Sequence, residues 1–367
     1  MTKPTLGNVV NGTVRWSPVK SLWWTGMTAT AIVGGAMTFS WSAFALFVVL
    51  TAAVLLFGHS LGSHRKLIHD SFACPGWLEY VLVYMGVQVG LSGPLGLLAQ
   101  HDLRDHSQSQ PHCHDYLRHG RPFLLDGWWQ LHCELQLDAP PALPVRASVA
   151  NDRFYRFLER SWMLQQLPPA LLLYLAGGWA FVIWGVCARI AAGVTGHWLI
   201  GWFAHNHGGM HHAVDGAAVQ GRNVRFAALL TMGESWHNNH HAFPGSARLG
   251  LYAGEWDPGW WTLMLLKRAG LVWQLRLPDA CPARPELRAL DDAPQALGET
   301  PVSVRVLRSA TSRRLSLYYR GSRITGLPAL LIAAGSRNPC TAVAVVVLLP
   351  FATAAEVLRN RMQACCG

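Results

Sequence analysis

The chain has 367 residues, of which 51% are hydrophobic and only 14% are charged, whereas a soluble domain usually carries about 25% charged residues. This deficit, together with 17 tryptophans that favour a membrane–water interface, argues against a soluble protein and predicts an integral membrane protein. The net charge of +10 fits either a nucleic acid or loops beside an anionic leaflet, but the basic residues alternate with long apolar stretches, so we expect a membrane and no nucleic-acid partner.

The first half of the chain contains two apolar segments of spanning length and a third that is interrupted. Residues 22–40 and 41–58 contain no charged residue and are separated by a polar break near Ser40. Each has about the length that crosses a bilayer. The stretch 78–99 contains Gly90, Gly93, Pro94 and Gly96, so it either crosses or dips in and returns, as interrupted segments do when neighbours bury them.

A second pair of apolar segments, 167–186 and 190–204, is separated by a short turn at Arg189. Basic residues gather before the first pair and between the two pairs, whereas the turns inside the pairs are nearly uncharged. The positive-inside rule then places the N-terminus, residues 59–160 and everything after 205 in the cytoplasm. The sequence therefore predicts an all-α integral membrane fold with four transmembrane helices in two hairpins and a cytoplasmic helical cap.

Three parts are expected along the chain: a cytoplasmic N-terminal segment (1–21), a membrane domain (22–278) and a C-terminal extension (279–367). The extension is rich in Ala, Arg and Pro to about residue 326 and contains no histidine. Its apolar run 341–358 is either a helix against the membrane or part of an extended tail. We expect it to carry none of the chemistry.

The 17 histidines all lie between His59 and His241. The first cluster, His59 to His64 followed by Arg65, lies at the end of the second apolar segment, and a second HxxxxH overlaps it from His64 to His69. Imidazole is the commonest neutral metal ligand. Five residues turn a helix by about 140°, which suits two ions or a site shared with other helices, although a histidine at a polar interface would give the same pattern.

The second cluster begins with His101, Asp102, Arg104, Asp105 and His106, and His112, His114 and His119 follow it. Taken alone it also fits a solvated loop. The carboxylates of Asp102 and Asp105 are candidates to hold the far ring N–H of a ligating histidine, which fixes its tautomer and orientation.

The third cluster is the strongest. His237, His240 and His241 follow Glu234, and positions i, i+3 and i+4 share one face of a helix. Adjacent histidines diverge by about 100°, so two ions in one site are within reach. A fourth group at the end of the last apolar segment contains His205, which we expect to be a ligand because an unpartnered histidine is costly there.

So many histidines exceed the three or four ligands of one zinc ion. Nitrogen-rich sites suit zinc, copper, iron or nickel, and a position at the membrane surface, where an apolar substrate can enter, favours two redox metals. A histidine-rich metal transporter is the rival from another class. It predicts ionisable residues inside the apolar segments, and these have almost none.

Residues 22–278 resemble the membrane fatty acid desaturase family, especially its bacterial acyl-CoA branch, which carries histidine boxes HxxxxH, HxxHH and HxxHH. Residues 58–65 resemble the first box with its trailing arginine, and residues 233–244 resemble the third box with its flanks. His205 resembles the extra histidine at the end of the last span. Residues 104–106 look like the start of the second box, but its next two histidines fall on Ser109 and Gln110, so either His101, His112 or His114 compensates or the site has fewer ligands. Gly201 stands where an asparagine that holds a metal-bound water is common.

The resemblance implies oxygen-dependent insertion of a cis double bond into a fatty acyl chain, presumed on acyl-CoA, at a di-iron centre. It implies O2 as co-substrate, electrons from an external ferredoxin-like or other reductase donor, and a place in the bacterial inner membrane with the active site on the cytoplasmic side. No catalytic group beyond the metal centre is expected. A membrane di-iron hydroxylase acting on an alkane, sterol or carotenoid is the alternative. The expected metal ligands are His59, His64, His101, His106, His114, His205, His237, His240 and His241, supported by Asp102, Asp105 and Glu234.

Overall fold

The computed structural model describes residues 7–290, 305–308, 315–319 and 322–324. The chain separates into two compact units, residues 1–260 with 270–295, and residues 261–269 with 296–367. The expected boundary at residue 278 stays a prediction.

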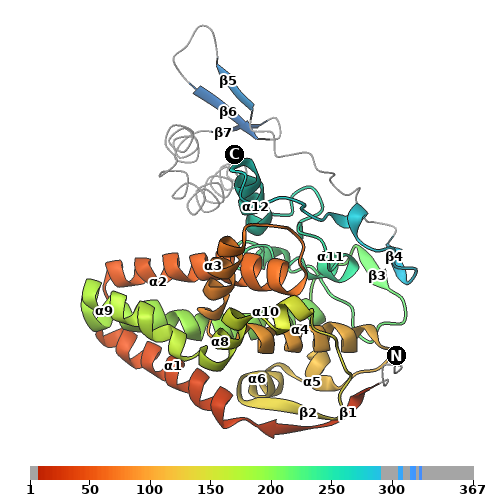
Figure 1. The fold of residues 1–367 in the computed structure, drawn as a ribbon, viewed down its shortest axis with the longest axis horizontal. Helices are drawn as coiled ribbons and strands as arrows, with labels where there is room; N and C mark the ends of the chain where they lie inside the picture. Colours follow the sequence, from red (N-terminus) through yellow and green to blue (C-terminus); the bar gives the residue numbers. More distant parts are fainter. Residues whose placement is uncertain (1–6, 291–304, 309–314, 320–321, 325–367) are drawn as a thin grey trace, which may run out of the picture. The chain divides into compact units, whose positions relative to one another are not determined.

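The described chain is mainly helical, and its helices lie in the first unit except for most of α12, which belongs to the second (Figure 1). The described helices are α1 (Pro18–Met37), α2 (Trp41–Ala53), η1 (Val54–Ile68), α3 (Gly76–Val87), α4 (Pro94–Ser109), α5 (Asp115–Arg118), α6 (Phe123–His132), α7 (Ala147–Ala150), α8 (Arg153–Ser161), η2 (Leu164–Gln166), α9 (Leu167–Val182), η3 (Ile183–Ala188), α10 (Arg189–Asn206), η4 (Arg225–Ala227), α11 (His237–Ala242), α12 (Pro258–Arg268) and η5 (Pro278–Ala280).

Small antiparallel sheets, which the all-α expectation omits, join distant parts of the chain. In the first unit β1 (Asn8–Trp16) pairs with β2 (Cys133–Ala139), and β3 (His212–Val214) pairs with β4 (Leu287–Ala289). The described residues of the second unit include a three-stranded sheet. Its strands are β5 (Arg305–Arg308), β6 (Leu315–Tyr319) and β7 (Ser322–Ile324).

Two helical stretches of the described chain are long and apolar enough to cross a membrane, Trp41–Ile68 with 28 residues and Leu164–Asn206 with 43. The break expected near Ser40 lies where α2 begins, and the Ser40 hydroxyl accepts a hydrogen bond from the Ala43 amide. The stretch expected at 22–40, now α1, is not among the two, so four crossing helices in two hairpins remain a prediction.

The turn expected at Arg189 is wrong. The helix runs through Arg189, whose buried guanidinium donates hydrogen bonds to the Gly185 carbonyl and the Gln166 side chain. The chain instead turns inside α9, where Gly178 has a φ of 63°. Glycine adopts that conformation without steric cost, whereas the charge of Arg189 is accommodated by neighbouring polar groups.

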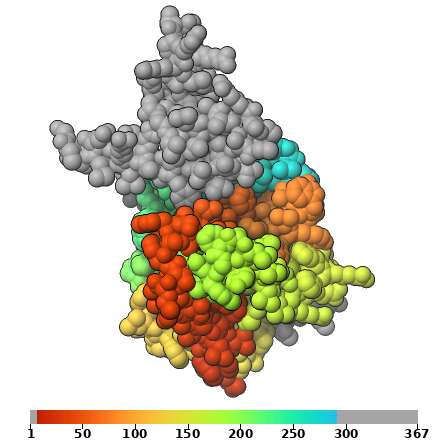
Figure 2. All heavy atoms as spheres, turned by 90° about the vertical axis from the view of Figure 1, so that its left-hand side faces the viewer, coloured from red at the N-terminus to blue at the C-terminus, as the bar shows by residue number. Residues whose placement is uncertain are grey.

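The ends of α1, α2 and α9 lie together at one side of the first unit (Figures 1 and 2). Their large apolar side chains are exposed: Ile32, Val33, Met37, Trp41, Leu171, Leu172, Leu175 and Trp179. An exposed apolar surface of this kind marks contact with lipid or a partner, and it agrees with the low charge content of the whole chain.

Helices η1 and α3 touch backbone to backbone at Gly62. A Cβ atom at this position would overlap the Leu82 carbonyl. We therefore expect Gly62→Ala to destabilise the protein by about 1–3 kcal/mol, the usual cost of overpacking, and to lower the midpoint of thermal unfolding in detergent. Gly26→Ala is the matched control, because a Cβ there meets nothing within 4 Å. Equal midpoints for the two variants would contradict this packing.

Candidate metal centre

Four histidines from three helical segments converge on one point. His64 lies in η1, His69 directly after η1, His101 in α4 and His240 in α11. One ring nitrogen from each lies within 4.8 Å of the others. We call these residues the first group.

Three further histidines form a second group beside it. His205 lies near the end of α10, and His237 and His241 lie one turn apart in α11. The Nε2 atom of His237 is 3.0 Å from Nε2 of His241 and 3.3 Å from Nε2 of His205. His240 belongs to the other group, so the short helix α11 serves both, as the divergence of adjacent histidines predicts.

The ring nitrogens of the first group are in large part unsatisfied. His69 Nε2, His101 Nδ1 and both ring nitrogens of His240 are buried and have no hydrogen-bond partner. Buried polar atoms without partners are rare in native proteins and point to a bound water or ion. Three ring nitrogens that face one another in the second group likewise suit a cation between them. Both groups therefore fit a nitrogen-preferring metal ion.

Burial and neighbouring charges favour the neutral form of His69, His237 and His241, which is the form of histidine that binds metals. Burial lowers the pKa of His69 and His237 well below its usual value, and it lowers the pKa of His241 to about 4. Neighbouring histidines add to the effect in each case. The rings are therefore neutral at pH 7, which leaves a lone pair for a metal.

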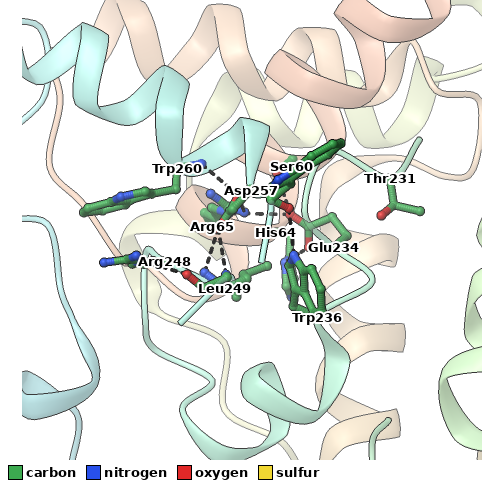
Figure 3. Close-up of polar contacts among 12 residues, drawn as sticks. Ser60, His64, Arg65, Thr231, Glu234, Trp236, Arg248, Leu249, Asp257 and Trp260 are labelled. Carbon is green, nitrogen blue, oxygen red and sulfur yellow. Dashed lines mark hydrogen bonds and ion pairs between the residues drawn. The ribbon is translucent and has the colours of Figure 1, made fainter. Parts of the chain in front are cut away.

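Glu234 contacts the ring of His64 in the first group (Figure 3). Its Oε2 lies 2.5 Å from His64 Nδ1, and its Oε1 accepts a hydrogen bond of 2.5 Å from Ser60 Oγ. Arg65 Nε lies 3.5 Å from Glu234 Oε1. A carboxylate at the far nitrogen of a ligating histidine fixes its tautomer and orientation, so the geometry suits the supporting role expected for Glu234.

The loop before α11 depends on Gly233. This residue has a φ of 97°, which L side chains rarely adopt, and a Cβ atom there would overlap Asp257. The Gly-Glu pair of the third cluster therefore has a physical reason: the glycine allows the turn that aims the carboxylate at His64.

The two aspartates expected as supports differ in position. Asp105 Oδ2 lies 3.6 Å from His101 Nδ1 and 3.8 Å from His240 Nε2. Asp102 Oδ1 lies farther from His101 Nδ1, at 4.0 Å. Asp105 is thus the carboxylate that faces the first group from helix α4.

Three of the expected ligands lie outside both groups. His59 packs against His197, with ring centroids 5.3 Å apart. His106 lines a cavity. His114 caps α5, where its Nδ1 accepts a hydrogen bond from the Tyr116 amide.

His69 is the group member that the list of expected ligands omits. The sequence signal for His69 is the overlapping HxxxxH pair from His64 to His69, in which Arg65 follows the first histidine. The structure brings together the second of the two overlapping pairs. From the second cluster, His101 belongs to the first group, and neither Ser109 nor Gln110 belongs to either group.

His119 lies close to the second group but is engaged elsewhere. Its ring stacks on that of His205, with centroids 5.5 Å apart. Its Nδ1 lies 2.9 Å from the buried Asp126 carboxylate, and the Arg104 guanidinium contacts its Nε2. Burial and the Arg104 cation lower the pKa of His119 to about 4, although Asp126 opposes them. Both ring nitrogens are therefore occupied.

A cavity of about 490 Å³ opens beside both groups. His69 of the first group, His241 of the second and Asp105 line its inner part, and Arg276 and Arg284 add positive charge. Arg284 donates a hydrogen bond to the His241 carbonyl. A polar molecule or headgroup with negative charge would be attracted to this cavity.

No family model matches the chain. Several curated proteins are similar to it. The acyl-CoA 5-desaturase of Anemone leveillei is 36% identical over 247 residues, which are 66% of this chain and 74% of that protein. The sn-1 stearoyl-lipid 9-desaturase of Anabaena variabilis is 36% identical over 242 residues, 66% of this chain and 86% of that protein. The sn-2 palmitoyl-lipid 9-desaturase of Nostoc sp. is 35% identical over 242 residues, 64% and 81% of the two chains.

Proposed function

Because this chain belongs to the fatty acid desaturase family, and is therefore an oxidoreductase that acts on fatty acyl chains, we propose that it inserts a cis double bond at two iron ions held by the two histidine groups. The observation that carries the proposal is the convergence of seven buried or half-buried histidines on two adjacent points. Apolar helices lead to that place, as a substrate with a long hydrocarbon chain requires.

The chemistry demands a metal. Acid–base side chains cannot break an unactivated C–H bond, and iron with O2 supplies the oxidising power when it is bound. Two hydrogens from the acyl chain, two electrons from an external donor and two protons from solvent reduce O2 to two water molecules. We propose a ferredoxin-like protein or another reductase as that donor.

The residues of the chain hold and shield the centre. His64, His69, His101 and His240 would hold one ion, and the second group would hold the other. Glu234 keeps the His64 ring in one orientation through its contact with Nδ1. Burial lowers the pKa of His69, His237 and His241 and so favours their neutral form, and it excludes water from the reacting region.

We propose acyl-CoA as the substrate, with an acyl lipid as the alternative, because the relatives include desaturases named for each. The positive cavity beside the metal groups supports an anionic headgroup. The chain is a membrane protein, and the distribution of its basic residues supports a bacterial inner membrane with the site on the cytoplasmic side.

Expression in a host that lacks its own desaturases tests the function. We expect new monounsaturated fatty acids in the total profile, and we expect them to arise on added acyl-CoA in isolated membranes. Formation on preformed lipid alone would select the alternative substrate. A hydroxylated product without a double bond, or an unchanged profile from iron-loaded protein supplied with an electron donor, would contradict the proposal.

A further inference from the structure

We propose that Asp105 is an oxygen ligand shared by the two histidine groups, so that the metal pair is held by seven histidines and one carboxylate. The inference rests on the proposed function, because it needs two bound metal ions. It changes the role of Asp105 from an outer support to a direct ligand.

The two groups are unequal. The first offers four ring nitrogens and the second only three. Nitrogen-ligated metal sites usually hold three or four protein ligands, so the second group has room for one more donor. The described residues around it offer three candidates besides Asp105: His119, Gln108 and His197.

None of these three carries a negative charge, although the Gln108 carbonyl oxygen is buried and has no hydrogen-bond partner. Both nitrogens of His119 are occupied by Asp126 and Arg104. Gln108 points its amide nitrogen at His205 Nε2, at 3.0 Å, and donates from the same nitrogen to the Leu117 carbonyl. His197 packs on His59 instead.

Asp105 has the spacing of a ligand. Its Oδ2 lies 3.6 Å from His101 Nδ1 and 3.8 Å from His240 Nε2. These distances are too long for hydrogen bonds. Two atoms that each bind one ion at about 2.0–2.2 Å lie about 3–4 Å from each other, so the carboxylate stands where a fellow ligand of these histidines would stand.

Asp105 also faces the second group. It lines the same cavity as His69 of the first group and His241 of the second. Burial lowers the pKa of His101, His237 and His241, and the Asp105 charge opposes that effect in all three. One carboxylate is thus within electrostatic reach of both groups.

Charge balance favours the same role. The seven histidines are neutral ligands, and the buried Arg104 adds a positive charge beside them. Glu234, the carboxylate that contacts His64, is already engaged by Arg65 and Ser60, which favours Asp105 as the anion that offsets the charge of two divalent cations. A bound carboxylate reduces the net charge that must be buried.

Iron content of the purified full-length protein tests the inference. We expect two irons per chain in the wild type, a fall of about twofold or more in Asp105→Asn, which keeps the size of the side chain but not its charge, and two irons again in Asp105→Glu. Asp102→Asn is the matched control, on the same helix and next to the same histidine, and should keep two irons. Two tightly bound irons in Asp105→Asn would overturn the inference and leave the proposed function standing.

A second measurement needs no variant. In protein labelled with 13C at the aspartate carboxyl, the infrared difference between metal-free and metal-loaded wild type should show carboxylate bands that shift with the label. Absence of such bands would overturn the inference even if the variants failed to fold. If the wild type binds fewer than two metals, both the shared ligand and the proposed di-iron function are contradicted. The two failures are distinguishable, because two tightly bound irons in Asp105→Asn contradict only the shared ligand.

Discussion

Replacing His240 with alanine is expected to abolish desaturation. His240 is almost fully buried, and its ring lies between the two groups: its centroid is 4.6 Å from that of His64 and 5.6 Å from that of His237. Loss of a residue that only supports a ligand typically costs about 10–100-fold in metal affinity or activity. Loss of a ligand at the centre should exceed that range, so we expect more than about a 100-fold fall in product.

The measurement is the fatty acid profile of a desaturase-deficient host, normalised to the amount of protein in the membrane. The control is His207→Ala, because His207 is exposed and packs only on Trp202 and Phe203 among the rings around it. We expect its profile to match the wild type. If His240→Ala protein is present in the membrane at a normal level and still forms monounsaturated chains, the first group is not the reacting centre.

The spacing of the third cluster predicted its geometry because short-range helical periodicity is robust. His237 and His241 turn to one group and His240 to the other, as a helix with adjacent histidines about 100° apart requires. The membrane character was readable as well, since low charge and long apolar runs leave few other folds.

The first cluster could not be resolved from the sequence alone. Two overlapping HxxxxH pairs share His64, and choosing between His59 and His69 requires the winding and the end of the helix. η1 winds as a π-helix, which changes the direction of each side chain, and it ends just before His69. Asp70, at a φ of 47°, then turns the chain away. Tertiary packing decides these features, and no local pattern reports them.

The second cluster stays open in the sequence for a related reason. The resemblance puts the start of its box at Arg104–His106 and names His101, His112 and His114 as substitutes, whereas the fold brings His101 into the first group and points Arg104 toward His119. A sequence shows which residues could bind a metal, but only the fold shows which of their lone pairs are already taken. The turn in the second apolar pair is a parallel case, because a charged Arg189 suggested a loop and a buried hydrogen-bond network keeps it in the helix.

Replacing Asp257 with alanine is expected to destabilise the whole first unit by about 3–5 kcal/mol, the usual cost of removing one partner from a buried ion pair. Asp257 and Arg65 are both 1% exposed, and Arg65 Nη2 donates to Asp257 Oδ1 at 2.7 Å (Figure 3). The other carboxylate oxygen accepts hydrogen bonds from the Leu249 and Gly250 amides. Without Asp257, the Arg65 cation would lose its nearest carboxylate, and these two buried amides would lose their acceptor.

The effect should reach the metal groups, because Arg65 also lies against Glu234, the carboxylate beside His64. We therefore expect Asp257→Ala to lower both the midpoint of thermal unfolding and the iron content of the purified protein. Asp215→Ala is the matched control: Asp215 and Arg288 form an exposed pair, 61% and 59% accessible, and such pairs contribute only about 0–1 kcal/mol. A midpoint for Asp257→Ala equal to that of the control would contradict the claim that this buried pair anchors the helix carrying His64 to the loop that aims Glu234.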